Sequence, residues 1–101
     1  MIKDASKEDV EFHLGSGKVI LDVWKNGCPP CSRMEPIFSK LDEEINDVLF
    51  IKVKADDNMD YVASDLKVRN APTFILFNNG EEVKRISGYV SEVELRNFIE
   101  E

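Results

Sequence analysis

Residues 19–36 read VILDVWKNGCPPCSRMEP. They contain a predicted buried strand, then a pair of cysteines, and then the start of a predicted helix. The segment Lys18–Trp24 is a nearly continuous apolar run, as expected for a strand that is covered on both faces. The helix that follows is predicted over Pro30–Glu44. Its apolar positions recur at helical spacing: Met34, Ile37, Phe38, Leu41 and Ile45. A buried strand that turns directly into an amphipathic helix is typical of an α/β domain.

Three further strands are predicted after the cysteine pair. Leu49–Ala55 and Thr73–Asn78 are short apolar runs of strand length. Asn79-Gly80 comes directly after the second run, and this dipeptide strongly favours a tight hairpin turn. We therefore expect the chain to reverse there and to form a last strand over Val83–Ser87.

Three shorter helices complete the predicted order. Ser6 and Ser91 are typical N-cap residues, each followed three positions later by an acidic residue. The apolar positions of these helices are Val10 and Leu14, then Met59, Val62, Ala63 and Leu66, then Leu95, Phe98 and Ile99. We expect one domain over residues 1–101, with an α/β fold in which a small mixed central sheet carries helices on both faces.

Acidic residues outnumber basic ones by 20 to 13 in the 101-residue chain, which gives a formal net charge of -7. A chain of this charge is repelled by phosphate backbones and by anionic lipid head groups. No apolar stretch has the length of a signal peptide or of a membrane span. We therefore expect a cytoplasmic protein without nucleic-acid or membrane partners, although a mature form that had lost a leader would look the same. We also expect it to be a monomer.

Cys28 and Cys31 are the only cysteines in the chain, and two prolines separate them. A disulfide across so short a loop removes little entropy from the unfolded chain, so stabilisation explains the pair poorly. Zinc also explains it poorly, because a closed zinc site needs four ligands and His13 is the only histidine. Thiol–disulfide exchange is the remaining use of the pair, and its attacking group is a thiolate.

The start of the predicted helix supplies what this exchange needs. Unpaired N–H groups and the positive end of the helix dipole favour an anion there, and Cys28 lies at that point. Cys31 lies in the first turn on the same side, so it can attack a mixed disulfide formed at Cys28. Pro29 and Pro30 suit a helix start, because its first N–H groups have no partner in the helix and a fixed φ is favourable.

The chain resembles the thioredoxin family over nearly its whole length. The active-site segment of that family is similar to residues 19–36, with Asp22, Trp24, Cys28, Pro30, Cys31 and Pro36 at the expected positions. The cis-proline segment of the family resembles residues 68–81, which read VRNAPTFILFNNGE, and Gly88 matches a glycine beside the substrate groove. A CxxC pair near a β–α–β pattern is itself typical of thioredoxin-like redox proteins. The resemblance therefore implies a thioredoxin fold.

The resemblance also implies roles for the residues that contact a substrate. Cys28 is expected to be the attacking thiol and Cys31 the resolving thiol. Pro72 is expected to be a cis-proline that faces the two cysteines. The backbone of Ala71 is then available to pair with an extended substrate peptide.

Further roles follow for the residues behind the cysteines. Asp22 is expected to be a buried carboxylate there, with Lys52 as its neighbour. Trp24 is expected to pack under the active-site turn. Pro36 is expected to kink the helix, because it cannot donate a hydrogen bond to the Ser32 carbonyl.

The chain departs from the family pattern beside both cysteines. The family usually has a tryptophan before the first cysteine, a glycine after it and a lysine after the second; this chain has Gly27, Pro29 and Ser32. Gly27, Pro29 and Pro30 border the expected substrate surface. The missing aromatic side chain removes part of the surface that meets partner proteins. The added proline changes the rigidity of the turn and the access to the thiolate, both of which set the redox poise.

Asp22 interrupts the apolar run of the first predicted strand. It shares one face of that strand with Ile20 and Trp24, so a carboxylate is expected among apolar neighbours. Burial disfavours the charged form and is expected to raise the pKa of Asp22 above the usual value of about 3.9. Two interpretations stay open: Asp22 accepts the proton of Cys31 during exchange, or it only pairs with Lys52.

These features together predict a thiol–disulfide oxidoreductase that mainly reduces protein disulfides. The resemblance implies that a thioredoxin reductase-type donor with a flavin supplies the electrons, that disulfide-containing client proteins receive them, and that no cofactor is bound. One alternative is a glutaredoxin-like, oxidising or isomerising exchange, although Ala71-Pro72-Thr73 differs from the threonine-valine-proline segment expected there. The other alternative is a thioredoxin-fold binding module that does not use its thiols.

Overall fold

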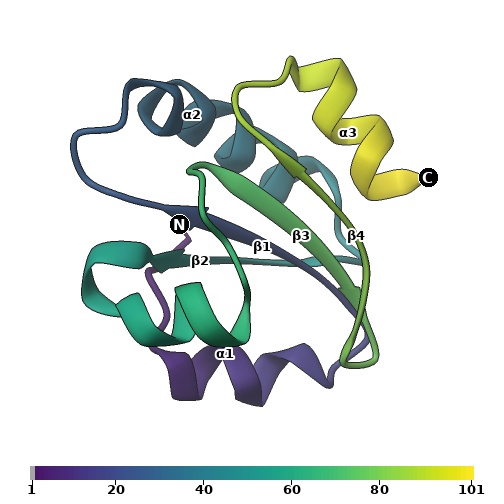
Figure 1. Ribbon diagram of the computed structural model, residues 1–101. Coiled ribbons are helices and arrows are strands. Elements are labelled where there is room, and N and C mark those ends of the chain that lie inside the picture. The colour runs from purple at the N-terminus through teal and green to yellow at the C-terminus, as the bar shows by residue number, and fades with distance from the viewer. Residues whose placement is uncertain (1) are drawn as a thin grey trace.

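A four-stranded sheet forms the centre of the molecule, with the strand order β2–β1–β3–β4 (Figure 1). The strands are β1 (Lys18–Trp24), β2 (Leu49–Lys54), β3 (Thr73–Asn78) and β4 (Glu81–Ser87). β1 runs parallel to β2 and antiparallel to β3, and β3 and β4 form an antiparallel hairpin. This structure is a computed structural model that describes residues 2–101. The predicted mixed sheet is confirmed.

Helices cover both faces of this sheet (Figure 1). α2 (Pro29–Glu44) and α3 (Glu92–Glu100) lie on one face, while α1 (Lys7–Leu14) and η2 (Tyr61–Asp65) lie on the other. A short 3-10 turn, η1 (Ala55–Asp57), follows β2. Within residues 2–101 no helix combines the length and the apolar character needed to cross a membrane. The layered α/β fold agrees with the prediction.

Alternating residues of β1 enter two separate cores. Val19, Leu21 and Val23 are fully buried among the side chains of the α1 and η2 layer. Ile20 is buried in the core beneath α2 and α3. Asp22, two residues further along the strand, points to the same face as Ile20 and is only 4 % exposed. The alternation therefore places a carboxylate beneath the helix that carries the cysteines, as the sequence predicts.

Local signals set the ends of the elements. Ser6 caps α1 by accepting a hydrogen bond from the backbone N–H three residues later. At α3, Ser91 and Glu94 form a complete capping box, with both hydrogen bonds at 3.1 Å. Asn79 and Gly80 have φ values of 52° and 86°, as a tight hairpin between β3 and β4 requires. Both capping positions and the predicted hairpin turn are confirmed.

The predicted apolar face of the third helix is confirmed for Val62 and Leu66 and wrong for its two other residues. Met59 is 71 % exposed and Ala63 is also exposed, although both were expected to face the core. The segment forms a π-helix, in which the Leu66 N–H donates to the Tyr61 carbonyl five residues earlier at 2.9 Å. Each turn then contains an additional residue, so Tyr61 faces the core together with Val62 and Leu66.

Three element ends differ from the prediction by one or two residues. β2 ends at Lys54, because Ala55 already belongs to the 3-10 turn that follows. α2 begins at Pro29, one residue before the predicted start, and β4 begins at Glu81, two residues before it. Shifts of this size are usual at the ends of helices and strands. They leave the connection between β1 and α2 as predicted.

Candidate functional site

Cys28 is the N-cap residue of α2, and its backbone is extended with φ -121° and ψ 97°. Pro29 and Pro30 occupy the first two helical positions and have no N–H group. The next N–H, that of Cys31, donates to Cys28 Sγ at 3.3 Å. The N–H of Ser32 donates to the Cys28 carbonyl at 3.1 Å and makes the first bond of the helix. The helix start thus directs one amide at the first sulfur.

Cys28 and Cys31 are joined by a disulfide, and their Cα atoms are 5.2 Å apart. The structure therefore shows the oxidised form of the pair. Each cysteine is 7 % exposed, so burial does not distinguish the two sulfurs. What distinguishes them is the cap: only Cys28 Sγ receives the hydrogen bond from a helix N–H.

The loop before β3 faces the first cysteine. The Ala71–Pro72 peptide bond is cis, as predicted. The carbonyl oxygen of Ala71 lies 3.6 Å from Cys28 Sγ. Gly88, at the end of β4, donates its N–H to the Pro72 carbonyl at 2.8 Å. The fold thus brings Cys28, Ala71, Pro72 and Gly88 together, as the resemblance implies.

Asp22 is buried behind the cysteine pair without full hydrogen bonding. Its Oδ1 has no hydrogen-bond partner among residues 2–101. Burial raises the pKa of Asp22 to about 7, while the charge of Lys52 opposes this and those of Asp4 and Glu35 add to it. Lys52 is the β2 residue directly opposite Asp22 in the sheet. No ion pair joins the two side chains within the described part of the chain, so simple pairing does not account for Asp22.

A cavity of about 30 Å³ connects this carboxylate to the second cysteine. It is lined by Asp22, Trp24, Cys31, Ser32, Glu35 and Lys52. A polar cavity of this size has room for a water molecule. The geometry therefore allows a proton to pass between Cys31 and Asp22, either directly or through water.

Trp24 and Lys52 form the wall of this cavity next to β2. Lys52 Nζ lies 5.0 Å from the centroid of the Trp24 ring, a cation–π distance. The Trp24 Nε1–H donates to Asp4 Oδ1 at 2.6 Å. Sequence reasoning missed Asp4 and Glu35. Glu35 follows Cys31 by one helical turn, so helical spacing was a usable signal for it, whereas nothing in the sequence marks Asp4.

A model of one protein family matches the chain over residues 2–101, and its description is Thioredoxin. The chain belongs to the thioredoxin family. Like other thioredoxins it is a thiol–disulfide oxidoreductase, and Cys28 and Cys31 are its CxxC pair.

Relatives and solved structures of the family cover almost the same length. A thioredoxin of Mycoplasma genitalium is 34% identical over 89 residues, which cover 88% of this chain and 86% of the relative. The solved thioredoxin of Plasmodium falciparum has a TM-score of 0.89 and 26% identity, and the match covers 98% of this chain and 97% of that one.

A third similar chain comes from a structure whose subject is the thiol resolving mechanism of yeast mitochondrial 1-Cys peroxiredoxin through glutathione and thioredoxin systems. Its TM-score is 0.86 at 26% identity, and the match covers 97% of this chain and 92% of that one. These similarities confirm the thioredoxin fold.

The loop before the cysteines differs from the thioredoxin pattern at Gly27. This residue has a φ of +63°, and a Cβ atom added to it would meet nothing within 4 Å. The loop is held by the N–H of Asn26, which donates to Asp56 Oδ1 at 3.1 Å. Gly27 and Pro29 are exposed and Pro30 is half-buried, so all three border the surface around Cys28.

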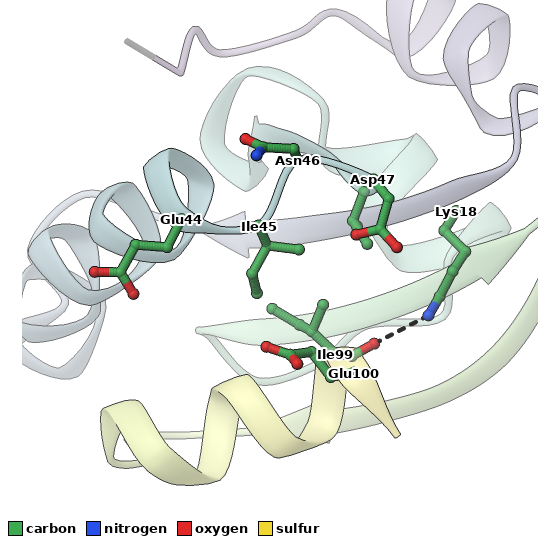
Figure 2. A pocket seen from close by; sticks show the side chains of 8 residues that line it. Lys18, Glu44, Ile45, Asn46, Asp47, Ile99 and Glu100 are labelled. Atoms are coloured by element: carbon green, nitrogen blue, oxygen red, sulfur yellow. Dashed lines mark hydrogen bonds between the residues drawn. The ribbon is translucent and has the colours of Figure 1, made fainter.

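A larger cleft, of about 240 Å³, lies at the opposite end of β1 from the cysteine loop. Figure 2 shows Lys18 reaching toward α3, where its Nζ donates to the Ile99 carbonyl at 3.3 Å. The charged residues Glu44, Asp47 and Glu100 also line this cleft. Residues 2–101 contain no group of three or more His, Cys, Asp or Glu side chains that could hold a metal ion. Cys31 lines the smaller cavity and not this cleft, so the thiol chemistry lies at the smaller cavity.

Proposed function

We propose that this thioredoxin-family protein works mainly as a reductant of protein disulfides, with Cys28 as the attacking thiol and Cys31 as the resolving thiol. One observation carries this assignment: the first helix N–H that follows the two prolines donates to Cys28 Sγ. A sulfur at this position is stabilised as a thiolate, which is the nucleophile of disulfide exchange.

In the first step the Cys28 thiolate attacks one sulfur of a client disulfide. A bond forms between Cys28 Sγ and that sulfur, the client disulfide breaks, and the other client sulfur leaves as a thiolate. The Ala71 carbonyl, 3.6 Å from Cys28 Sγ, is available to accept a backbone hydrogen bond from the client. This contact aligns the client segment across the cis-proline loop.

In the second step Cys31 gives up its proton and attacks Cys28 Sγ. The Cys28–Cys31 disulfide forms, the mixed disulfide breaks, and the second client sulfur leaves as a thiolate that takes up a proton. Two electrons have then passed from the Cys28–Cys31 dithiol to the client. Asp22 is the proton acceptor for Cys31, because burial holds its pKa at about 7 and both side chains line one cavity. The charge of Lys52 opposes a further rise of this pKa.

The small number of hydrogen-bond donors at Cys28 Sγ supports the proposal that the protein works as a reductant. A dithiol pair becomes a strong oxidant when its reduced form is strongly stabilised. Pro29 and Pro30 remove two N–H groups from the helix start, which leaves the Cys31 N–H as the amide that donates to Cys28 Sγ. The thiolate form is therefore only moderately stabilised, as suits a reductant.

We propose a flavin-dependent thioredoxin reductase as the electron donor and disulfide-containing proteins as the clients. Membership of the thioredoxin family supports both partner classes. One similar chain comes from a structure whose subject is thiol resolution in a yeast mitochondrial peroxiredoxin through glutathione and thioredoxin systems, which agrees with a protein client. The cytoplasmic location and the monomeric state stay predictions.

The reduction potential tests the proposed direction. The protein is equilibrated with defined ratios of reduced and oxidised glutathione, and the free thiols are then trapped and counted. A potential near about −270 mV is expected for a general reductant, whereas one near about −120 mV identifies an oxidant. An intermediate value, near about −180 mV, identifies an isomerising exchange instead.

A further inference from the structure

The start of the chain lies against the outer edge of β2, next to the cavity that joins Asp22 to Cys31 (Figure 1). Asp4 forms an isolated parallel bridge with Lys52, which lines that cavity. In this pairing the N–H of Ala5 donates to the Lys52 carbonyl at 2.7 Å. The pairing fixes the backbone of Asp4 beside the site, although its side chain is exposed.

The side chain of Asp4 holds the indole of Trp24. The Trp24 Nε1–H donates to Asp4 Oδ1 at 2.6 Å, and a hydrogen bond to a carboxylate is stronger than one between two neutral groups. Trp24 is the last residue of β1, is half-buried and lines the cavity. The hydrogen bond therefore sets the orientation of the largest side chain in the cavity wall.

Two lysines of β2 lie over the same indole ring. Lys52 Nζ is 5.0 Å and Lys54 Nζ is 5.4 Å from the ring centroid, both within the range of a cation–π contact. A carboxylate that accepts the indole N–H makes the ring more electron-rich, because neighbouring polar contacts polarise one another. Asp4 therefore strengthens the contact that keeps Lys52 against the ring, in the wall of the cavity.

Charged and titratable groups face Asp22 from three segments of the chain. Lys52 lies opposite it on β2, and Asp4 belongs to the N-terminal segment. Cys31 and Glu35 line the cavity from α2. Burial has the largest effect on the pKa of this carboxyl and raises it, the charge of Lys52 lowers it, and the charges of Asp4 and Glu35 raise it. The proton affinity of Asp22 thus depends most on how well the cavity excludes solvent.

We propose that Asp4 is a positioning residue for the resolving step: through the indole of Trp24 it keeps the cavity around Asp22 closed to solvent. This inference rests on the proposed function, in which Asp22 accepts the proton of Cys31. Without its hydrogen bond to Asp4 the indole turns away and water enters the cavity. Asp22 is then better hydrated, so its charged form is less disfavoured and it becomes a weaker base.

Three variants separate the hydrogen bond of Asp4 from its charge. Asp4→Ala removes both, whereas Asp4→Asn removes the charge and keeps an oxygen that can accept the Trp24 N–H. Asp57→Ala is the matched control, because Asp57 lines the same surface pocket as Asp4 but does not accept the indole N–H. Stopped-flow mixing with insulin measures the rate of the resolving step as a function of pH. Carbon-13 NMR of the oxidised proteins measures the titration of the Asp22 carboxyl independently of catalysis.

We expect Asp4→Ala to lower the pH midpoint of the resolving step and that of the Asp22 titration by about one pH unit. Above the midpoint the resolving rate should fall by about threefold, because a weaker base accepts the Cys31 proton less readily. Asp4→Asn should shift both midpoints clearly less, and Asp57→Ala should leave them unchanged. The first attack by Cys28 should stay within about twofold of the wild type in all variants, because Cys28 does not line this cavity.

Two results would overturn the role of Asp4. Equal shifts in Asp4→Ala and Asp4→Asn would mean that only its charge matters, and an unchanged or raised midpoint in Asp4→Ala would mean that it does not keep the cavity closed. A different result would reject the proposed function instead: a wild type whose resolving rate does not follow the Asp22 titration does not use Asp22 as its proton acceptor. The two failures are therefore distinguishable.

Discussion

The two ends of β1 carry hollows of opposite character. The cleft at the Lys18 end has a volume of about 240 Å³, whereas the cavity at the Trp24 end has only about 30 Å³. The large cleft contains ordinary charged surface groups, while the small cavity contains a buried carboxylate and a redox-active cysteine. In this protein the reactive site is therefore marked by a buried ionisable group, and not by the larger cavity volume.

Hydrogen-bond partners explain the difference between the two ends. In the large cleft, Lys18 donates to the Ile99 carbonyl, and Glu44 pairs with Arg96, which lowers the pKa of Glu44. In the small cavity, Asp22 Oδ1 has no partner among the described residues, and burial raises its pKa to about 7. A satisfied charge is stable and inert, but an unsatisfied buried one is ready to take up a proton.

Replacing the cysteines is expected to have the largest effect. Cys31→Ser should form a stable mixed disulfide with a client, because the resolving thiol is missing, and turnover should fall to the level of the buffer. Cys28→Ser should form no such adduct and should also be inactive. Non-reducing electrophoresis after incubation with oxidised insulin measures the adduct, and dithiothreitol should release it. If only Cys28→Ser formed the adduct, Cys31 would be the attacking thiol and Cys28 the resolving thiol.

The substitution Asp22→Asn is expected to have the next largest effect, on the resolving step. Removing a general base should slow the attack of Cys31 on the mixed disulfide by at least about tenfold near pH 7, while the first attack by Cys28 changes less. Stopped-flow mixing with a client disulfide separates the two steps. Normal resolution in this variant would make Asp22 a structural residue and would remove the functional contrast between the two ends of β1.

The same variant sharpens the comparison through its stability. The pKa of Asp22 is about 7 in the folded protein against 3.8 when unperturbed. Between these two values the folded chain keeps a proton that the unfolded chain has lost, so stability falls as pH rises from about 4 to about 7, and it does not change further above that range. Over this pH range the wild type should lose on the order of 4 kcal/mol of its free energy of unfolding. Asp22→Asn has no titrating carboxyl at this position, so it should not show this loss.

Denaturant melts of the oxidised protein at several pH values measure this difference. The informative quantity is the free energy of unfolding of Asp22→Asn minus that of the wild type, which should grow from pH 4 to pH 7. Parallel curves for the two proteins would show that Asp22 is not the buried titrating group.

A moderate effect is expected for Gly27→Ala, in the loop before the cysteines. The φ of +63° is unfavourable for any residue with a Cβ atom, so the substitution should cost about 1 kcal/mol of stability although the position has free space. Gly15→Ala is the matched control, because Gly15 has a φ of -79° and equally open surroundings. Thermal or denaturant melts should show a loss for the first variant only. Equal losses would mean that the conformation of the cysteine loop is not what requires glycine.

The smallest effect is expected for Lys18→Ala, in the large cleft. Losing the hydrogen bond to the Ile99 carbonyl should cost about 0.5–1 kcal/mol of stability. The rate of insulin reduction should not change, because no group of the exchange reaction lies at this end of β1. If Lys18→Ala is fully folded under the assay conditions and still reduces insulin more slowly, the two ends of β1 are coupled. The contrast drawn between the two ends would then be wrong.

Sequence reasoning predicts the parts of this molecule that depend on local pattern. The apolar alternation of β1 places Asp22 beneath α2, and the cap and the prolines place Cys28 at the start of that helix. The cis bond before Pro72 could be predicted because the family resemblance covers that segment, and the structure confirms it. These features rest on neighbouring residues in the chain or on a long shared motif.

The features that sequence reasoning misses depend on contacts between distant segments. The Val90 N–H donates to Met34 Sδ in α2, and nothing in the sequence around Val90 indicates that partner. The contact of Asp4 with Trp24 likewise joins two separate segments. The exposure of Met59 follows from one π-helical turn, which the 3.6-residue spacing does not describe.

The position of Trp24 gives this protein an internal optical reporter. It is the only tryptophan of the chain, and its indole lines the cavity that contains Cys31 and Asp22. A disulfide and a charged carboxylate both alter the emission of a nearby indole, so the fluorescence spectrum follows the oxidation of the cysteines and the titration of the buried acid without any added label. Both processes can therefore be timed in the unmodified molecule.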